Sequence, residues 1–257
     1  MILAVLTNPS KAALVTGAAK RIGRAIAFEL ARHGYDIGVH YGRSEADARA
    51  LVAELSALGV TAVAVQADLS DTLSVKALLP KAVGALGPIS LLVNNASVFS
   101  DDRLGSMTEA SWQSHIDTNL KAPVLLSQAF AAQAYIPDGA SIINIIDQRV
   151  LKPSPPFFSY GLSKAGLWHA TRTLAQELAP KIRVNAVGPG PTLPSIHQSA
   201  EDFAEEARAI LLQKATTPQE IASAVAYLAT APSVTGQMIC VDGGQHLNWR
   251  TPDMAGL

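Results

Sequence analysis

Short apolar runs alternate along the chain with longer segments in which apolar positions recur every three to four residues. The short runs are typical of buried strands, and the longer segments are typical of amphipathic helices that cover a sheet. We expect strands over residues 12–16, 36–41, 61–66, 89–94, 141–146, 182–187 and 237–241. We expect helices over residues 22–33, 44–58, 73–83, 112–133, 160–178 and 218–230.

This alternation predicts an α/β protein with a single doubly wound, Rossmann-type domain, in which helices cover both faces of a parallel sheet. No Pro/Gly/Ser-rich linker or repeat divides the chain. We assign residues 12–247 to the domain, 1–11 to a short N-terminal extension and 248–257 to a C-terminal tail. At the helix ends, Gly34 and Gly59 are placed to stop the first two helices, and Ser44 is placed to begin the second.

Composition narrows the class of protein. The 257 residues are 49% hydrophobic and 16% charged, which allows a sizeable core. A net charge of -1 gives no electrostatic case for binding nucleic acid or membrane. The single Cys240 excludes an internal disulfide and fits a reducing cytosol. We therefore expect a soluble, cytoplasmic protein that acts on a small molecule, and the histidine spacing predicts no metal site.

The segment Thr16–Gly23 joins the first expected strand to the first expected helix. At such a junction, backbone N–H groups and the positive end of the helix dipole bind a pyrophosphate, and glycines let the ligand approach the backbone. Gly17 and Gly23 fit this pattern, but Arg21 stands where a middle glycine is usual. A glycine-rich turn alone is a weak signal, because ordinary strand–helix connections use such turns as well.

The end of the second expected strand bears on the choice of dinucleotide. An NAD-binding chain places an acid there to hold the ribose 2′-OH, whereas this chain has no acid before Glu45. Arg43 and Ser44 offer a guanidinium fork and a hydroxyl, which suit a 2′-phosphate. Together with the nearby Lys20 and Arg21, they favour NADP(H). Alternatively, Arg43 is a solvated loop residue and Ser44 only caps a helix.

Tyr160 and Lys164 form a Tyr-x-x-x-Lys pair within an expected helix. Residues four apart lie on one helix face, so the lysine charge favours the phenolate of a tyrosine whose ordinary pKa is about 10. Such a phenol can protonate the heteroatom of a C=O or C=N group that receives a hydride. The alternative is an exposed tyrosine and lysine without a catalytic role.

Further short motifs follow the other expected strands in order: Asp68-Leu69, Asn94-Asn-Ala-Ser97, Pro189-Gly190 and Val241-Asp-Gly-Gly244. With the glycine turn and the Tyr-x-x-x-Lys pair, they resemble the short-chain dehydrogenase/reductase superfamily over residues 12–247. The resemblance implies a homotetramer and a cofactor site made of Gly17, Lys20, Arg21, Ile22, His40, Tyr41, Arg43, Ser44, Asp68, Leu69, Asn95, Ala96, Tyr160, Lys164, Pro189 and Gly190.

The same resemblance implies specific roles. Arg43 and Ser44 would hold the 2′-phosphate, the pair at 68–69 would line the adenine pocket, and Lys164 would also bond the nicotinamide ribose. Asn119 resembles the family's fourth catalytic residue, which relays protons from the lysine through water; alternatively, it is a polar helix residue bonded to the backbone. The tetramer would form through the helix before residue 133 and the helix around Lys164, where Ala165 and Gly166 would permit close approach.

A narrower resemblance is to the pteridine reductase branch. It is carried by Thr-Gly-Ala-Ala-Lys-Arg-x-Gly-Arg, His-Tyr-x-Arg-Ser, Gln-Ala-Asp-Leu-Ser, Asn-Asn-Ala-Ser-x-Phe and an aspartate at 147. The C-terminal Asp-Gly-Gly-x-His-Leu is similar to a bacterial member, the dihydromonapterin reductases. The resemblance implies that Arg21, Ser97 and Phe99 face a pterin, with Phe99 stacking the flat ring against the nicotinamide.

Asp147 lies thirteen residues before Tyr160, where most members of the superfamily carry a serine. A carboxyl can exchange a proton itself and can accept hydrogen bonds from the N–H groups of an aminopyrimidine. Burial would raise its pKa, whereas Lys164 and Arg21 would lower it, and the sequence leaves this balance open. Alternatively, Asp147 caps the following loop and Gln148 faces the substrate.

These observations lead to one favoured function and two alternatives. We expect an NADPH-dependent oxidoreductase that reduces a pterin, dihydropterin or folate-like C=N bond, with Asp147, Tyr160, Lys164 and Asn119 as catalytic residues. The first alternative is a short-chain reductase of a carbonyl or alcohol, in which the aspartate is an idiosyncratic substitution. The second is a non-catalytic NADP-binding regulator, against which the intact Tyr160 and Lys164 argue.

Overall fold

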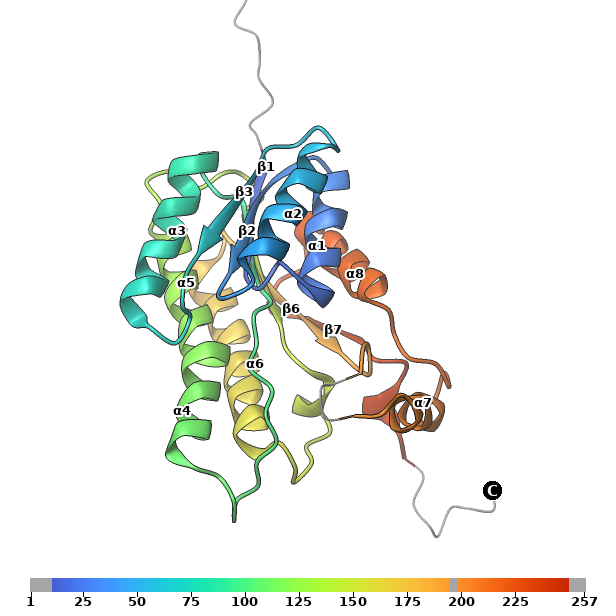
Figure 1. Cartoon of the computed structure of the whole chain (residues 1–257). Coiled ribbons are helices and arrows are strands. Elements are labelled where there is room, and N and C mark those ends of the chain that lie inside the picture. Colours follow the sequence, from blue (N-terminus) through green and yellow to red (C-terminus); the bar gives the residue numbers. More distant parts are fainter. Residues whose placement is uncertain (1–10, 195–197, 250–257) are drawn as a thin grey trace, which may run out of the picture.

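The structure is a computed structural model that describes residues 11–194 and 198–249 (Figure 1). Within these residues the strands form one seven-stranded sheet in the order β3-β2-β1-β4-β5-β6-β7, and every neighbouring pair is parallel. The strands are β1 (Lys11–Val15), β2 (Tyr35–Tyr41), β3 (Ala62–Gln66), β4 (Leu91–Asn94), β5 (Ser141–Ile145), β6 (Arg183–Pro189) and β7 (Met238–Val241). The expected single doubly wound α/β domain is confirmed.

Helices pack on both faces of this sheet (Figure 1). The helices are α1 (Arg21–Arg32), α2 (Glu45–Ser56), α3 (Thr72–Leu86), α4 (Glu109–Ile116), α5 (Ala122–Ala131), α6 (Phe158–Leu178), α7 (Ala200–Ala209) and α8 (Pro218–Thr230). One face carries α1, α2 and α8, and the other carries α3, α5 and α6, with α4 beside α6. None of the helices in the described part of the chain is both long and apolar enough to span a membrane.

The central strand β1 contributes side chains to two separate cores. Ala13 and Val15 belong to the core beneath α1, α2 and α8, whereas Ala12 and Leu14 belong to the core beneath α3, α5 and α6. All four are 0% exposed. Successive side chains of a strand point to opposite faces, so a strand covered on both sides must be apolar at every position. This explains the continuous apolar runs in the sequence.

The strand order reverses between β1 and β4. From β1 the chain builds outward through β2 and β3, then returns to place β4 on the other side of β1, with Val15 paired to Val93. In an open parallel sheet, the crevice at the carboxyl ends of such neighbouring strands is the usual ligand site. The glycine turn after β1 and the Asn-Asn-Ala segment after β4 both lie at this edge.

Several element boundaries differ from the expectation. The single helix expected over 112–133 is α4, a π turn η1 (Asp117–Lys121) and α5 in succession. Helix α7 was not expected. Lys11, expected in the N-terminal extension, begins β1. Asn248, expected in the C-terminal tail, accepts a hydrogen bond from Lys152 and donates one to the carbonyl of Ala209. The remainder of the two expected terminal segments, 1–10 and 250–257, lies outside the described residues.

The expected helix stops are confirmed, but the expected cap is only partly so. Gly34 and Gly59 follow α1 and α2 with φ angles of 78° and 89°, in the left-handed region that favours glycine. Ser44 occupies the N-cap position of α2, yet its side chain makes no capping hydrogen bond. Its hydroxyl is therefore not used to begin the helix.

Candidate active site

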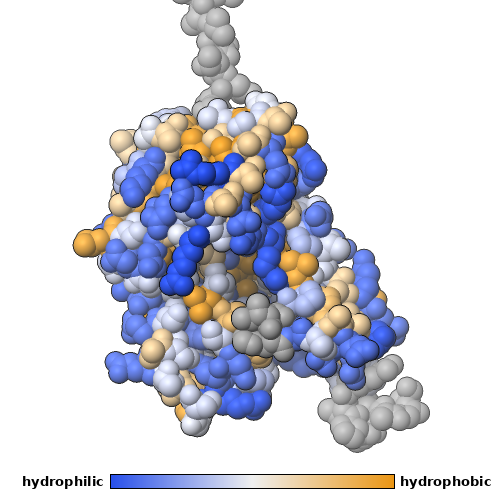
Figure 2. All heavy atoms as spheres, viewed as in Figure 1, coloured by the Kyte–Doolittle hydropathy of each residue, from blue (hydrophilic) through white to orange (hydrophobic). Residues whose placement is uncertain are grey.

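A cavity of about 650 Å³ lies at the carboxyl edge of the sheet, a volume that suits a small-molecule or cofactor site. The surface in Figure 2 is hollowed near its centre, where hydrophobic residues border hydrophilic ones. Residues from many separate segments line the cavity: Arg21, Ile22, Asn95, Ser97, Phe99, Ile145, Ile146, Asp147, Gln148, Arg149, Phe157, Tyr160, Lys164, Pro189, Gly190, Pro191, Thr192, Leu193, Gln198, Phe203, Glu206 and Gln245. Most of the residues expected to act on the substrate are among them.

The glycine turn after β1 is close-packed and leaves no room for side chains. A Cβ on Gly23 would lie 2.2 Å from the carbonyl oxygen of Gly17. The side-chain amide of Asn95 donates to the carbonyls of Thr16 at 2.8 Å and Gly17 at 3.2 Å, which joins the turn to the segment after β4. Arg21 adopts a left-handed φ of 52°, a conformation that glycine usually supplies.

His40 supports this turn from below. Its Nδ1 accepts a hydrogen bond from the N–H of Gly17 at 3.0 Å, and its Nε2 lies 3.2 Å from the carbonyl oxygen of Ala67. Burial lowers the pKa of His40 to about 4, although the bond to Ala67 acts in the opposite direction. The imidazole is therefore neutral, and both of its nitrogens are used within the protein. The imidazole thus bonds within the protein, and the expected contact between His40 and a cofactor stays a prediction.

The expected 2′-phosphate site lies beside α2. Arg43 is exposed and makes no hydrogen bond or ion pair with the rest of residues 11–194 and 198–249, and the hydroxyl of Ser44 is not used as a cap. Lys20, by contrast, forms an ion pair with Asp47 at 2.9 Å. Arg43 and Ser44 are consequently available to hold a 2′-phosphate, whereas Lys20 already has a carboxylate partner.

The expected adenine pocket lies close to Arg43. Hydrogen bonds from the hydroxyl and the N–H of Ser70 lower the pKa of Asp68, with a smaller contribution from the Arg43 charge. Leu69 is buried at 7% exposure, and Tyr41 is half-buried at the end of β2. These residues lie outside the set that lines the cavity of about 650 Å³, so the expected adenine pocket stays a prediction.

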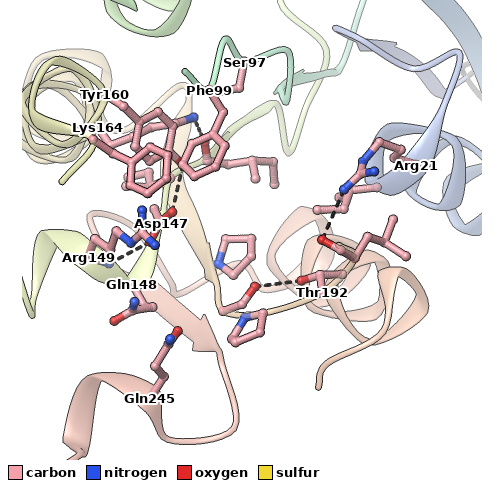
Figure 3. A pocket seen from close by; sticks show the side chains of 18 of the residues that line it. Arg21, Ser97, Phe99, Asp147, Gln148, Arg149, Tyr160, Lys164, Thr192 and Gln245 are labelled. Carbon is pink, nitrogen blue, oxygen red and sulfur yellow. Dashed lines mark hydrogen bonds between the residues drawn. The ribbon is translucent and has the colours of Figure 1, made fainter. Parts of the chain in front are cut away.

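Asp147 follows β5, and its two oxygens have different partners. Oδ1 accepts from the N–H of Arg149 at 2.8 Å and so caps the short helix η2 (Gln148–Val150). Oδ2 accepts from the phenol of Tyr160 at 2.8 Å (Figure 3). The carboxylate thus caps the following loop, as in the alternative, and also contacts the expected proton donor.

Burial dominates the electrostatics of this pair. It raises the pKa of Asp147, because desolvation outweighs the Arg149 N–H bond, the Tyr160 bond and the charges of Arg149 and Lys164. Burial and the neighbouring carboxylate raise the pKa of Tyr160 well above its ordinary value. The sequence left open whether burial or nearby positive charge decides the pKa of Asp147, and burial decides it. We expected the charge of Lys164 to favour the phenolate of Tyr160, whereas burial and Asp147 favour the neutral phenol.

Lys164 points to the sheet rather than directly to the phenol. Its Nζ donates to the carbonyl oxygen of Ile145 at 2.9 Å and lies 5.6 Å from the ring centroid of Tyr160. The residue is 2% exposed, and burial lowers its pKa to about 8, while the charge of Asp147 partly opposes the effect. The ammonium therefore titrates near the physiological range.

Asn119 lies in the π turn η1, a rare local geometry that is frequent at functional sites. Its carbonyl oxygen accepts from Val98 N at 2.8 Å and Ser97 Oγ at 3.2 Å. Its amide nitrogen donates to Val98 O at 2.9 Å and Ser163 Oγ at 3.1 Å. These bonds match the alternative of a polar helix residue bonded to the backbone, and a role in proton relay stays a prediction.

Aromatic rings line one wall of the cavity (Figure 3). Phe99 stacks on Phe157 with centroids 4.3 Å apart and meets Tyr160 edge-on at 4.8 Å. The guanidinium of Arg149 lies 4.8 Å from the Phe157 centroid. Phe157 has a left-handed φ of 59°, which costs about 1–3 kcal/mol for such a residue. Phe157 and Arg149 were missed because loops carry no periodic signal.

The opposite part of the cavity is polar; Arg21 and Gln148 were expected candidates there, whereas Gln245 and Glu206 were missed. Gln148 and Gln245 lie on one side, below Asp147, whereas Arg21 lies across the cavity (Figure 3). Gln148 is 4% exposed, and its Oε1 has no hydrogen-bond partner in the part of the chain that the structure describes. Glu206 accepts from Gln245 at 3.2 Å.

The loop after β6 closes the cavity. Gly190 must be a glycine, because a Cβ there would lie 2.7 Å from Asp242. Beyond it, Nη2 of Arg21 donates to the carbonyls of Leu193 at 3.3 Å and Pro194 at 3.2 Å. The glycine turn and the loop after β6 are therefore tied together by one guanidinium.

The chain is similar to known proteins over nearly its whole length. A model of the family described as enoyl-(acyl carrier protein) reductase matches residues 17–246. The 3-oxoacyl-(acyl-carrier-protein) reductase FabG of Staphylococcus aureus is 37% identical over 243 residues, which are 93% of this chain and 99% of that protein.

Two solved structures are similar as well. FolM alternative dihydrofolate reductase 1 from Brucella suis, in complex with NADP, is 47% identical with a TM-score of 0.91, over 95% of this chain and 98% of that one. A blue fluorescent protein from a metagenomic library, in complex with NADPH, is 37% identical with a TM-score of 0.85, over 91% and 97% respectively.

Proposed function

This chain belongs to the short-chain dehydrogenase/reductase family, and from that premise we propose that it is an NADPH-dependent reductase of a pterin or dihydropterin C=N bond. The family and the oxidoreductase class rest on similarity over nearly the whole chain. The pterin is our own assignment. It is supported by the buried Asp147–Tyr160 pair and by 47% identity to an alternative dihydrofolate reductase.

The chain uses NADP(H) as its cofactor, in keeping with the NADP and NADPH complexes of the similar structures. The residues fit the dinucleotide, because the glycine turn provides close backbone approach and the cavity runs from it to Lys164. Arg43 and Ser44 would hold the 2′-phosphate, and the turn from Gly17 would hold the pyrophosphate. When bound, NADPH supplies the hydride.

One observation carries the pterin assignment: the hydrogen bond of 2.8 Å between Tyr160 and a buried carboxylate. A serine could only donate and accept hydrogen bonds, whereas Asp147, whose pKa is raised by burial, can also exchange a proton itself. Its oxygen atoms can accept from the amino and ring N–H groups of an aminopyrimidine. Ser97 and the ring of Phe99 would contact the same flat heterocycle from the facing wall.

The proposed protonation balances the hydride that arrives at the C=N carbon. The O–H bond of Tyr160 breaks as an N–H bond forms on the substrate, which leaves a phenolate. Asp147, which begins the cycle as a neutral carboxyl group, then gives its proton to the phenolate of Tyr160, and solvent reprotonates the resulting carboxylate. Lys164 lies close enough to stabilise the phenolate while it exists.

The test follows NADPH absorbance with a dihydropterin, dihydrofolate and a panel of ketones under equal conditions. We expect kcat/KM for the dihydropterin to exceed that for the best ketone at least about tenfold, as a site built around specific hydrogen bonds discriminates strongly. Turnover of ketones alone would overturn the pterin assignment and leave the family intact.

A second candidate is reduction of a carbonyl, favoured by the 37% identity to a 3-oxoacyl-(acyl-carrier-protein) reductase. Asp147→Asn separates the two. The variant keeps the size and the cap of η2 but cannot exchange a proton, so pterin turnover should fall about 100-fold, with NADPH binding unchanged. Under the carbonyl alternative, Asp147→Ser would retain ketone reduction at the rate of the unaltered enzyme, because a hydroxyl suffices there.

We also propose a cytoplasmic homotetramer, in which α4, α5 and α6 meet their copies. Gly166 does not support this assembly in the expected way, because a Cβ there would lie 2.8 Å from Leu120 of the same chain. The absence of a side chain at Gly166 is explained by its close packing against Leu120 within one subunit. Light scattering of the purified protein tests the assembly, and a monomer of 26.9 kDa would exclude it.

A further inference from the structure

Helix α6 begins without a cap from its own sequence. Its N-cap position is Phe157, which has φ 59° and ψ 47° and makes no capping hydrogen bond with its side chain. The ring of Phe157 stacks on Phe99 instead. The first N–H groups of any helix need partners from outside it, and without them the first turn frays. Tyr160 is the third residue of α6, so the phenol is carried by this first turn.

Asp102 supplies the missing partners from a loop 57 residues earlier. Its Oδ1 accepts from the N–H of Ser159 at 2.9 Å, and its backbone carbonyl accepts from the N–H of Phe158 at 3.1 Å. The other carboxylate oxygen accepts from the hydroxyl of Ser111 in the first turn of α4. The side chain is only 4% exposed, and both of its oxygens are used.

The electrostatics agree with a cap that stays ionised. Burial alone would raise the pKa of Asp102, but hydrogen bonds from Ser111 and Ser159 outweigh it, and the pKa lies below its ordinary value. The charge of His115 acts in the same direction. A carboxylate is therefore present at neutral pH at the positive end of α6, where negative charge is favourable.

We propose that Asp102 is a positioning residue for the proton donor: it fixes the first turn of α6 and thereby holds the phenol of Tyr160 against Asp147. The same loop carries Ser97 and Phe99, which line the cavity. The carboxylate of Asp102 therefore holds this loop and the first turn of α6, which carries Tyr160, in a fixed relative position. The catalytic consequence rests on the proposed role of Tyr160, whereas the capping itself does not.

The test compares Asp102→Ala, Asp102→Asn and the neighbouring Asp101→Ala. Asp101 is exposed and serves as the matched control. Three readouts are needed: kcat and KM with NADPH and whichever substrate class the unaltered enzyme reduces, the dissociation constant of NADPH, and hydrogen–deuterium exchange of the amides at 158–161. The last needs no substrate, so it tests the cap even where the proposed function fails.

For Asp102→Ala we expect kcat to fall about tenfold, because the donor is displaced in a reaction that depends on its alignment. Amide exchange at 158–161 should rise about tenfold as the turn opens. The dissociation constant of NADPH should change less than about twofold, since the glycine turn is remote from the cap. Asp101→Ala should match the unaltered enzyme in all three readouts.

Rescue by the conservative variant distinguishes positioning from general stability. Asp102→Asn can still accept from Ser159, so it should recover most of kcat and normal exchange. Where Asp102→Ala does not fold, Asp102→Asn and Ser111→Ala carry the test, and the latter should raise exchange at 158–161 and lower kcat together. Unaltered exchange and kcat in Asp102→Ala, or an Asp102→Asn variant with normal exchange and no activity, would overturn the proposal.

Discussion

Acid should destabilise this protein through His40, a residue that never needs to touch the substrate. Burial lowers the pKa of this imidazole to about 4 from an ordinary 6.5. Because the folded-state pKa is the lower one, the unfolded chain takes up the proton first. The contribution is fully present above pH 6.5 and is lost as the pH falls from 6.5 towards 4. At about 1.4 kcal/mol for each tenfold difference, the full loss is about 3 kcal/mol.

Protonation of His40 should disrupt the glycine turn after β1, because the imidazole accepts a hydrogen bond from that turn. Neutral His40 accepts the N–H of Gly17 at 3.0 Å, and a protonated imidazole has no lone pair for that bond. Cofactor affinity should therefore weaken with stability, since Gly17 opens the turn that we propose holds the pyrophosphate. The control is His40→Asn, whose Oδ1 can replace Nδ1 as the acceptor but does not titrate.

The assay is chemical denaturation at pH 7 and pH 4.5 for both proteins. The unaltered protein should lose about 2 kcal/mol more than His40→Asn between these two pH values, because other carboxylates titrate alike in both. At pH 7 the variant itself should be about 1 kcal/mol less stable, having lost the bond to Ala67. Equal losses in the two proteins, or an NMR titration of the imidazole near 6.5, would refute the reasoning.

Three further predictions concern the cofactor side of the site. Gly23→Ala should destabilise the fold by at least about 2 kcal/mol in thermal denaturation, because its Cβ would lie 2.2 Å from a carbonyl oxygen. The control Gly84→Ala has no atom within 4 Å of the new methyl group in α3 and should instead stabilise by about 1 kcal/mol; a neutral Gly23→Ala would contradict the close packing. Burial lowers the pKa of Lys164 to about 8, so its ammonium is lost above that pH and NADPH binding should weaken there in fluorescence titrations. Lys164→Met should show no such step, and a flat profile in the unaltered enzyme from pH 7 to 9.5 would count against this role. Arg43→Ala should weaken NADPH about tenfold and leave NADH unchanged, whereas equal losses for both would remove the guanidinium from the 2′-phosphate site.

The order of strands and helices was predictable because the central strands β1, β4 and β5 are covered on both faces. That burial leaves a continuous apolar run, and the glycines at 34 and 59 mark helix ends through a backbone angle that only they adopt freely. Helix α7 was missed although its capping box of Ser199 and Asp202 is visible in the sequence, since its acidic residues obscure the apolar period.

The site was predictable only where a motif encodes it. The contact of Asp147 with Tyr160 followed from a resemblance. The bonds of His40 to Gly17 and Ala67 were not foreseen, because sequence cannot show which side of a strand end is buried. Asp102 was invisible for a different reason. Its bonds join segments 57 residues apart, and a hydrogen bond across that distance leaves no periodic trace. Nor does local propensity identify Phe157, whose left-handed conformation depends on tertiary stacking.

The two cores on either side of β1 have a consequence for how this enzyme can evolve. Residues that support Gly17 and the α1–α2 side pack in one core, whereas Leu14 and Ala175 of α6 pack in the other. Substitutions in different cores share no partners, so their effects on stability should add. Substitutions beneath α1 and α2 can therefore accumulate while the packing beneath α3 and α5 stays unchanged. Because the sheet separates these two cores, mutations on one face change the packing there and leave the packing on the other face intact.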